Sequence, residues 1–391
     1  MKNFLLIDFG ASLMHTHHSR VIRGFIELIE GDGYQVSVYL PLGSEIAIVG
    51  KHATHRRILV PSYHPVGFRL KHPTSWIPGF TRILYSKTEN SKWQSVVSSI
   101  LSRLIVEFAL LGVKGNIRKF PDSILIFPTA CPISVRLGKR IKDKFSQTKL
   151  VYRLTNTAEN RGYFTRYFDS PLELSKLIES FPTDIRVGYE MKEYANSLKF
   201  SESNLYYSPT PPCLEIGEKS IGWAKGTFGF LGMAQRHKGT NWLVEIISKT
   251  LANAEDNSLS WIIQTEDPPP NELLELSTKL PVKLLPGRLS ESEMSWAFTN
   301  IDLVCLPYNV ESYKRNASAL AYRAADNLTA VATFKGSAFA CEVENFGIGL
   351  VASDMDSLIS DISNFDTESS KERIVEYNKI RTQSNRNLIS W

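Results

Sequence analysis

The most constraining feature of the sequence is a helix-forming segment held between two short apolar runs. The runs are IDLVCLP (301–307) and TAVATF (329–334), and each has the length and apolar content of a buried strand. Residues 317–326 between them are rich in alanine, which favours an α-helix, and Asn316 is the expected N-cap. We therefore predict strand, loop, helix and strand in this order, as found in parallel α/β sheets.

The loop ahead of this helix is rich in groups that bind anions. A helix start offers unpaired N–H groups and the positive end of the helix dipole. The side chains nearest to it in the sequence are Tyr308, Tyr313, Lys314, Arg315, Asn316 and Ser318. The segment therefore suits a phosphate, although an ordinary capped helix with solvated charges explains the same residues.

The start of the chain shows the same alternation of strand and helix. FLLIDF (4–9) and YQVSVYLP (34–41) are expected strands, and residues 19–30 place apolar side chains on one helical face. We therefore predict an α/β fold of doubly wound, Rossmann-like sheets, whose ligands bind at the carboxyl ends of the strands.

A polar loop follows the first of these strands and contains His15, His17 and His18. These histidines can face solvent, contact a substrate or hold a metal. No matching cluster of Cys, His or Asp accompanies them in the sequence, so the metal is the least favoured of the three.

Length and composition divide the chain into two domains. A chain of 391 residues is long for one core, and segment 208–226 is rich in Pro and Gly and lacks periodicity. The α/β alternation starts again with TFGFLGMA (227–234). We expect domains at 1–207 and 227–369, joined by this linker, and a charged helix at 370–391 that packs back across both.

The net charge of +5 conceals a strongly basic segment. Residues 51–120 hold twelve Lys or Arg and two Glu, and aromatic residues alternate with cations around 68–87. The stretch 93–113 has apolar residues at helical spacing. A packed helix with a solvated basic loop explains these features, and so does contact with an anionic membrane surface. Binding to a nucleic-acid backbone is the least favoured explanation.

The overall composition is that of a soluble globular protein. Hydrophobic residues make up 43% of the chain and charged residues 22%, which excludes bulk disorder. No apolar run approaches the ~18–20 residues of a membrane span, and the apolar start stops at Asp8, too early for a secretory signal. The four cysteines are far apart and three adjoin apolar runs, so we expect buried thiols in a reducing, cytoplasmic compartment.

Several segments together resemble the GT-B glycosyltransferases, specifically the large retaining family 4-like group (glycosyl transferases group 1). GFLGMAQRHKGTNWLVE (229–245) resembles that family's strand–G–x5–K–G–helix segment. PYNVESYKRNASALAYRAADNLTAVAT (307–333) is similar to a P-Y-…-Y-x-R-[ST]-S-G-…-E-A-…-G-x-P-V-V pattern. VENFGIGLV (343–351) follows as in the family, and HHSRVIRG (17–24) is similar to its first loop.

The resemblance implies an enzyme that transfers a sugar from a nucleoside diphosphate sugar, which serves as co-substrate. It also implies that the transfer needs no cofactor and no metal and that the configuration of the sugar is retained. It implies that domain 227–369 binds the nucleotide sugar and that domain 1–207 binds a polysaccharide, glycolipid or other glycan acceptor across a cleft. The expected setting is polysaccharide biosynthesis in the cytoplasm, with peripheral attachment to the inner face of a membrane through residues 51–120.

The resemblance also implies the site residues. Lys238, Arg315 and Ser318 would stabilise the leaving diphosphate, where negative charge develops. The other donor-binding residues would be Gly232, Arg236, Gly287, Arg288, Leu289, Tyr308, Tyr313, Asn316, Ala317 and Tyr322, with 287–289 against the base. On the acceptor side we expect Gly10, His17 and His18.

The sequence departs from the family pattern at its paired Glu-x7-Glu positions, which fall near Lys314 and on Tyr322. In the family the first carboxylate holds donor-sugar hydroxyls and the second holds the ribose, and Glu311 is the nearest carboxylate here. An apolar residue, Met233, also stands where the family usually has Arg, with Arg236 close by. The alternative function is therefore a catalytically inactive GT-B-like protein that binds a nucleotide, a glycan or a partner protein.

Overall fold

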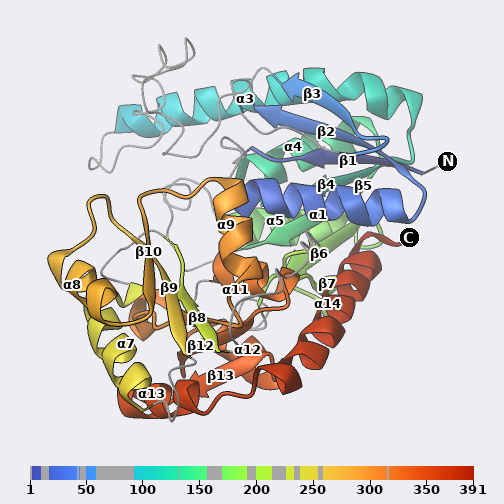
Figure 1. Cartoon of the computed structure of the whole chain (residues 1–391). Coiled ribbons are helices and arrows are strands. Elements are labelled where there is room, and N and C mark those ends of the chain that lie inside the picture. The colour runs from blue at the N-terminus through green and yellow to red at the C-terminus, as the bar shows by residue number, and fades with distance from the viewer. Residues whose placement is uncertain are drawn as a thin grey trace. The chain divides into compact units, whose positions relative to one another are not determined.

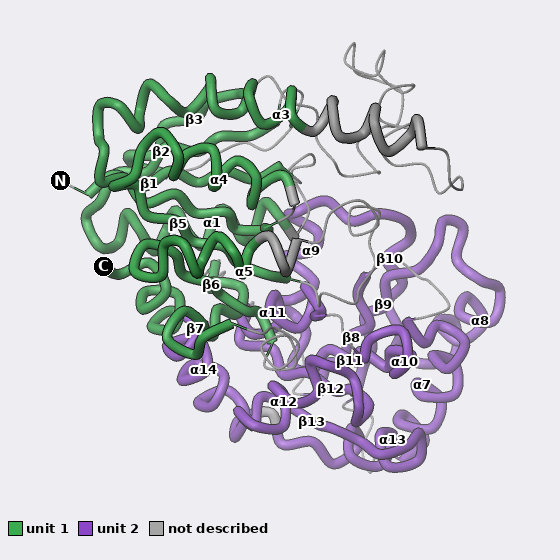
Figure 2. Tube along the Cα trace, turned by 180° about the vertical axis from the view of Figure 1, so that it is seen from behind, with its two compact units in different colours: residues 1–213, 382–391 green, residues 214–381 purple. Residues whose placement is uncertain are grey.

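The protein consists of two compact units. The computed structural model describes residues 2–9, 17–41, 44, 50–58, 92–130, 132–155, 170–191, 200–213, 226–232, 238–253, 259–314 and 317–391. Residues 1–213 together with 382–391 form the first unit, and residues 214–381 form the second (Figure 2). The expected linker, 208–226, contains the boundary between the two, and its residues 214–225 lie outside the described ranges.

The first unit is built on a sheet of seven parallel strands in the order β3-β2-β1-β4-β5-β6-β7 (Figure 1). The strands are β1 (Asn3–Ile7), β2 (Gln35–Pro41), β3 (Thr54–Ile58), β4 (Ile124–Phe127), β5 (Lys149–Leu154), β6 (Ile185–Tyr189) and β7 (Leu205–Tyr207). The helices of this unit are α1 (His17–Gly31), α3 (Lys92–Lys119), α4 (Pro132–Lys144) and α5 (Ser170–Ser180).

Alternation along β1 divides the core of this unit into two clusters. Leu5 and Ile7 belong to a cluster with α3, α4 and α5, whereas Phe4 and Leu6 belong to a cluster with α1 and the end of α14 (Thr367–Ile389). Successive strand residues point to opposite faces, so each cluster covers one face of the sheet. Burial on both faces explains why the predicted strands are nearly continuous apolar runs.

The second unit repeats this plan with six parallel strands in the order β10-β9-β8-β11-β12-β13. The strands are β8 (Thr227–Phe230), β9 (Ser260–Thr265), β10 (Val282–Pro286), β11 (Leu303–Leu306), β12 (Ala330–Phe334) and β13 (Gly349–Ala352). The helices are α7 (Leu243–Ala252), α8 (Asn271–Lys279), α9 (Glu291–Thr299), α10 (Val310–Tyr313), α11 (Ala319–Asp326), α12 (Ala340–Phe346), α13 (Met355–Ser363) and most of α14.

The strand order reverses beside the first strand of each unit. In the first unit β1 lies between β2 and β4, and in the second unit β8 lies between β9 and β11. Open parallel sheets bind ligands outside the carboxyl ends of the strands at such a reversal. The predicted fold class, doubly wound α/β, is confirmed, and the loops after β8 and β11 occupy this position in the second unit.

Helix α14 belongs to both units, because the boundary falls between Arg381 and Thr382. In the second unit, Arg381 Nη1 donates to Asp326 Oδ1 at 2.8 Å. In the first unit, Leu388 and Ile389 complete the core cluster that contains α1.

Some local predictions are wrong. Ser318, not Asn316, caps the helix of the opening segment, since its side chain accepts a hydrogen bond from the N–H of Ala321 and α11 begins at Ala319. The basic segment contains the strand β3, which the sequence did not indicate because its first four residues are polar and exposed. Cys341 is exposed, whereas Cys213 and Cys305 are buried as expected.

Ser290 caps α9, and Glu293 completes a capping box with it. The fourth cysteine, Cys131, lies outside the described residues. Within the described part of the chain, no helix is long and apolar enough to cross a membrane.

Candidate functional site

The loops that follow β8 and β11 meet backbone to backbone. Gly232 and Gly239, in the loop after β8, both have left-handed backbones, with φ of 100° and 79°. A Cβ atom on Gly239 would lie 2.1 Å from the carbonyl oxygen of Pro307, just beyond β11. Only glycine fits this approach, so the glycine that precedes the α7 region is required by the site's own geometry.

Lys238 is a partly buried cation at this junction. Its ammonium lies 3.4 Å from the position that a Cβ atom on Gly232 would occupy. Burial lowers the pKa of Lys238 below its ordinary value of 10.5, and among the described residues no carboxylate offsets this effect. A desolvated ammonium that lacks a counter-charge favours the binding of an anion.

The start of α11 lies on the other side of the junction. Leu320, in its first turn, has its Cδ1 atom 2.7 Å from the same Cβ position on Gly232. Ser318 is buried, and its hydroxyl both caps α11 and hydrogen-bonds the hydroxyl of Tyr308. Ser318 thus fixes where the helix begins, and Ala317 is partly exposed just before it.

Aromatic rings pack together around the loop between β11 and α11. The rings of Tyr308 and Tyr313 lie 4.3 Å apart between centroids, and Phe339 packs edge-on against both, at 5.7 and 6.2 Å. Burial raises the pKa of the Tyr308 hydroxyl well above its ordinary value of 10.0, which keeps it protonated. The two tyrosines therefore shape the loop through packing and through neutral hydroxyl groups.

A buried amide ties two of the predicted donor-binding loops together. Gln264, near the end of β9, accepts a hydrogen bond from Gly232 N at 2.7 Å and donates to Gly287 O at 2.8 Å. Its side chain is buried. The sequence did not single out Gln264, although a lone amide inside the apolar strand LSWIIQT was a usable signal.

The segment expected to face the base follows β10. Gly287 has φ of 76° and donates its N–H to Thr265 O at 3.0 Å, which turns the chain away from the sheet. Arg288 is exposed, whereas Leu289 is buried ahead of the α9 cap. Arg288 is therefore the exposed side chain of this segment.

Tyr322 is a residue of α11 and belongs to a buried cluster between this helix and α14. Its ring is 5.2 Å from the guanidinium of Arg381, which pairs with Asp326. Asn378 accepts from the same guanidinium at 2.7 Å and donates to Ala325 O at 2.7 Å. Asp326 thus anchors α11 on α14.

The remaining predicted residues are placed only in part. Gly10, Arg236, Arg315 and Asn316 lie outside the described residues, as does the side chain of His17. Glu311 and Lys314 are both exposed at α10 and just after it.

The first unit brings a histidine to the carboxyl end of β1. His18, in the first turn of α1, is buried, and its Nδ1 lies 3.1 Å from each carboxylate oxygen of Asp8. Asp8 follows β1 directly and is itself buried. The carboxylate fixes the orientation of the ring at the sheet edge where an acceptor is expected.

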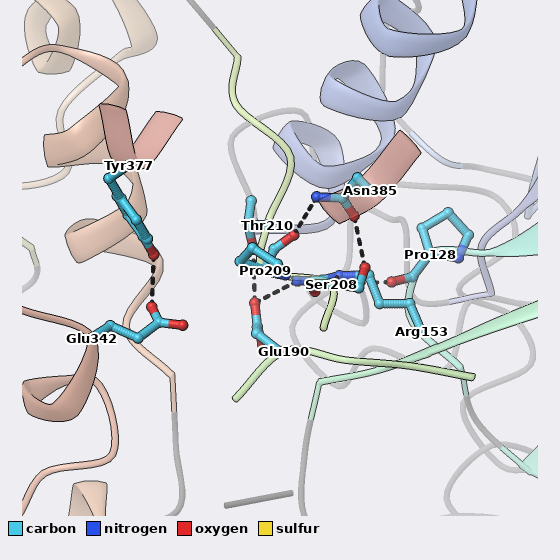
Figure 3. Close-up of polar contacts among 9 residues, drawn as sticks. All are labelled: Pro128, Arg153, Glu190, Ser208, Pro209, Thr210, Glu342, Tyr377 and Asn385. Atoms are coloured by element: carbon cyan, nitrogen blue, oxygen red, sulfur yellow. Dashed lines mark hydrogen bonds and ion pairs between the residues drawn. The ribbon is translucent and has the colours of Figure 1, made fainter. Parts of the chain in front are cut away.

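A second buried network joins the carboxyl ends of β4, β5, β6 and β7 (Figure 3). Arg153 Nη2 donates to Glu190 Oε1 at 2.6 Å and to Thr210 Oγ1 at 3.1 Å. Arg153 Nε and Nη1 donate to the carbonyl oxygens of Ser208 and Pro128 at 2.9 and 3.3 Å. This network is inaccessible and holds the edge of the sheet in place.

Asn385 of α14 extends this network (Figure 3). Its Nδ2 donates to Pro209 O at 2.9 Å, and its Oδ1 accepts from Ser208 Oγ at 2.7 Å. Neither Arg153 nor Asn385 was singled out from the sequence.

Comparison with known proteins gives a consistent fold. No family model and no curated protein sequence matches the chain. An apo structure of OtsA matches 100% of both chains, with a TM-score of 0.62 and 10% identity. A mutant of S. aureus TarM in complex with Fondaparinux, alpha-GlcNAc-glycerol and UDP also matches 100% of both, with a TM-score of 0.61 and 10% identity.

A third solved structure is a UDP-forming alpha,alpha-trehalose-phosphate synthase from Burkholderia xenovorans, in complex with glucose-6-phosphate. It matches 98% of this chain and 97% of its own, with a TM-score of 0.59 and 8% identity. These likenesses span both units, and the chain therefore has the GT-B fold.

Proposed function

We propose that the protein is a glycosyltransferase that moves a sugar from a nucleoside diphosphate sugar to a glycan acceptor. The observation that carries this proposal is Lys238, a partly buried ammonium at the strand reversal of the second unit with no described carboxylate beside it. Structures of the same fold hold UDP or glucose-6-phosphate, which supports a phosphorylated ligand.

The groups at this junction suit a leaving diphosphate. Negative charge develops on the phosphates as the bond to the sugar breaks, and Lys238 would stabilise it electrostatically. Arg315 would add a second cation, and the unpaired N–H groups at the start of α11 would donate to phosphate oxygens. Ser318 would position the start of α11, because its hydroxyl already caps this helix and hydrogen-bonds Tyr308.

The proposal assigns the acceptor to the first unit. His18, oriented by Asp8 at the end of β1, would contact an acceptor hydroxyl, with Gly10 and His17 beside it in the sequence. A polysaccharide, glycolipid or lipid-linked acceptor agrees with the cationic segment 51–120. Retention without a metal, and a cytoplasmic location at the inner face of a membrane, complete the proposal.

Ligand-dependent thermal unfolding tests the donor site. A nucleoside diphosphate or its sugar at about 100 times its dissociation constant stabilises the binding state by roughly 2.7 kcal/mol, enough to raise the unfolding temperature by several degrees. We expect one nucleotide to do so and Lys238→Ala to weaken its binding about 10- to 100-fold. The matched control is Lys379→Ala, an exposed lysine on α14. If no nucleotide shifts the wild type, the donor proposal fails.

The alternative function is that of a GT-B-like binding protein without catalysis. Lys314 and Tyr322 stand where the family pattern has carboxylates, and Tyr322 is buried against Arg381. Nucleotide binding without sugar transfer or donor hydrolysis by the purified protein would favour this alternative. Turnover of the donor by the wild type, reduced in Glu311→Gln, would favour the enzyme. It would also identify Glu311 as the carboxylate that replaces the family's missing glutamate.

A further inference from the structure

The outer face of α3 carries an exposed apolar stripe. Leu104, Phe108 and Leu111 are 49%, 45% and 53% exposed and lie on one helical face, at spacings of four and three residues. They are three of five large hydrophobic side chains that are at least 40% exposed in the described part of the chain. The opposite face of α3 is buried in the core, so the stripe is not needed to hold the helix.

Cations surround this stripe. Arg103 precedes it and Arg118 and Lys119 follow it on the same helix, all three exposed. The strand β3, packed beside α3, adds exposed Arg56, which is on the same face of the sheet as Ile58 and α3. The single acidic residue of α3, Glu107, is already paired with Arg140 of α4, at 2.5 Å between Oε1 and Nη2.

We propose that this face of α3 docks the protein on an anionic membrane surface. Apolar side chains that enter the headgroup boundary, flanked by Lys and Arg that meet anionic headgroups, are the pattern of interfacial helices. A second copy is a poorer occupant, because a symmetric contact would bring the cations of two stripes together. Upstream, Trp93, Val97 and Ile100 continue the apolar spacing in the sequence.

This inference gives the proposed membrane association a defined surface and does not depend on the donor site. Its test is sedimentation of the full-length protein with vesicles. We expect binding to vesicles of phosphatidylcholine and phosphatidylglycerol in equal parts, weaker binding with added salt, and no binding to phosphatidylcholine alone. Nucleotide-dependent unfolding is measured on each variant in parallel, so a failed docking surface and a failed donor site give different results.

Two variants address the stripe and its cations. The triple change Leu104→Ser, Phe108→Ser and Leu111→Ser should abolish vesicle binding. The double change Arg118→Gln and Lys119→Gln should weaken it about 25-fold, at roughly five-fold per cation. The matched control on α8, Leu274→Ser with Lys279→Gln, removes an exposed apolar residue and an exposed cation and should bind as wild type does.

Any of three outcomes would overturn the proposal. The first is undiminished vesicle binding by a folded triple variant, the second is a wild type that does not bind anionic vesicles, and the third is a dimer that depends on the stripe. If the wild type is a dimer by analytical ultracentrifugation and the triple variant is a monomer, the stripe is instead an interface between copies.

Discussion

Arg153 and Glu190 form an ion pair, 2.6 Å between Nη2 and Oε1, in which neither side chain reaches solvent. Removing one partner of a buried pair leaves an uncompensated charge in a medium that solvates it poorly. We predict that Glu190→Gln lowers the free energy of unfolding by about 3–5 kcal/mol, measured by denaturant titration.

The matched control for this pair is exposed. Arg140 and Glu107 are 46% and 43% exposed at their side chains, so Glu107→Gln should cost less than about 1 kcal/mol. Equal losses in the two variants would show that burial does not govern the Arg153–Glu190 pair.

Gly239 and Gly33 allow a steric effect to be separated from a backbone effect. Both have nearly the same φ, 79° and 80°, but a Cβ atom meets Pro307 O at Gly239 and nothing within 4 Å at Gly33. Gly33→Ala should cost only the left-handed penalty, about 1–2 kcal/mol. Gly239→Ala should cost about 3–5 kcal/mol and weaken nucleotide binding, as measured by unfolding and by calorimetric titration.

Gln264 holds the loops after β8 and β10 at a fixed separation through two hydrogen bonds. Gln264→Met keeps the volume but strands Gly232 N and Gly287 O, so stability should fall by about 2–4 kcal/mol and nucleotide affinity should fall with it. Gln383→Met, an exposed control on α14, should change stability by less than about 0.5 kcal/mol. If a folded Gln264→Met variant binds nucleotide with unchanged affinity, the loops after β8 and β10 are not part of the nucleotide site.

The lowered pKa of Lys238 predicts opposite effects on folding and on binding. The ammonium is disfavoured in the folded state, so the unfolded chain holds the proton more tightly and stability rises with pH as Lys238 releases it. Lys238→Met should therefore stabilise the ligand-free protein at neutral pH while it weakens nucleotide binding.

The pH dependence supplies the check on Lys238. The stability advantage of Lys238→Met should shrink as the pH rises from the lowered pKa toward the ordinary lysine value of 10.5. Urea unfolding of the two proteins across this range measures the difference. A constant difference would mean that the charge of Lys238 is not the cause.

The cysteines should react at very different rates. Cys341 is exposed on α12, whereas Cys213 and Cys305 are fully buried, and burial raises the pKa of the Cys305 thiol far above its ordinary value. In a Cys131→Ser background, a thiol reagent should label one site rapidly in the folded protein and three in denaturant, as counted by mass spectrometry. Rapid labelling of Cys305 would contradict its burial.

Much of the fold could be predicted because each buried strand is a short apolar run between helix signals. IDLVCLP forms β11 and TAVATF forms β12, as expected. The strand β3 escaped prediction because an edge strand with exposed polar residues lacks the apolar pattern on which such predictions depend.

The glycines of the candidate site could be predicted from the sequence because the backbone geometry requires them. Gly239 permits the close approach to Pro307 O, and Lys238 lies beside Gly232 in the same loop. Gln264 and Arg153 could not be predicted, since their roles depend on contacts between residues far apart in the sequence. Ser318 displaced Asn316 as the cap because local sequence ranks both residues as good caps and packing decides between them.

The boundary inside α14 makes the first unit discontinuous in the gene. Residues 1–213 alone lack Leu388 and Ile389 from the core and Asn385 from the Ser208 network. A protein truncated after residue 213 would therefore have an incomplete core on the α1 side of the sheet. Producing this domain alone requires circular permutation or a short fusion that restores residues 382–391.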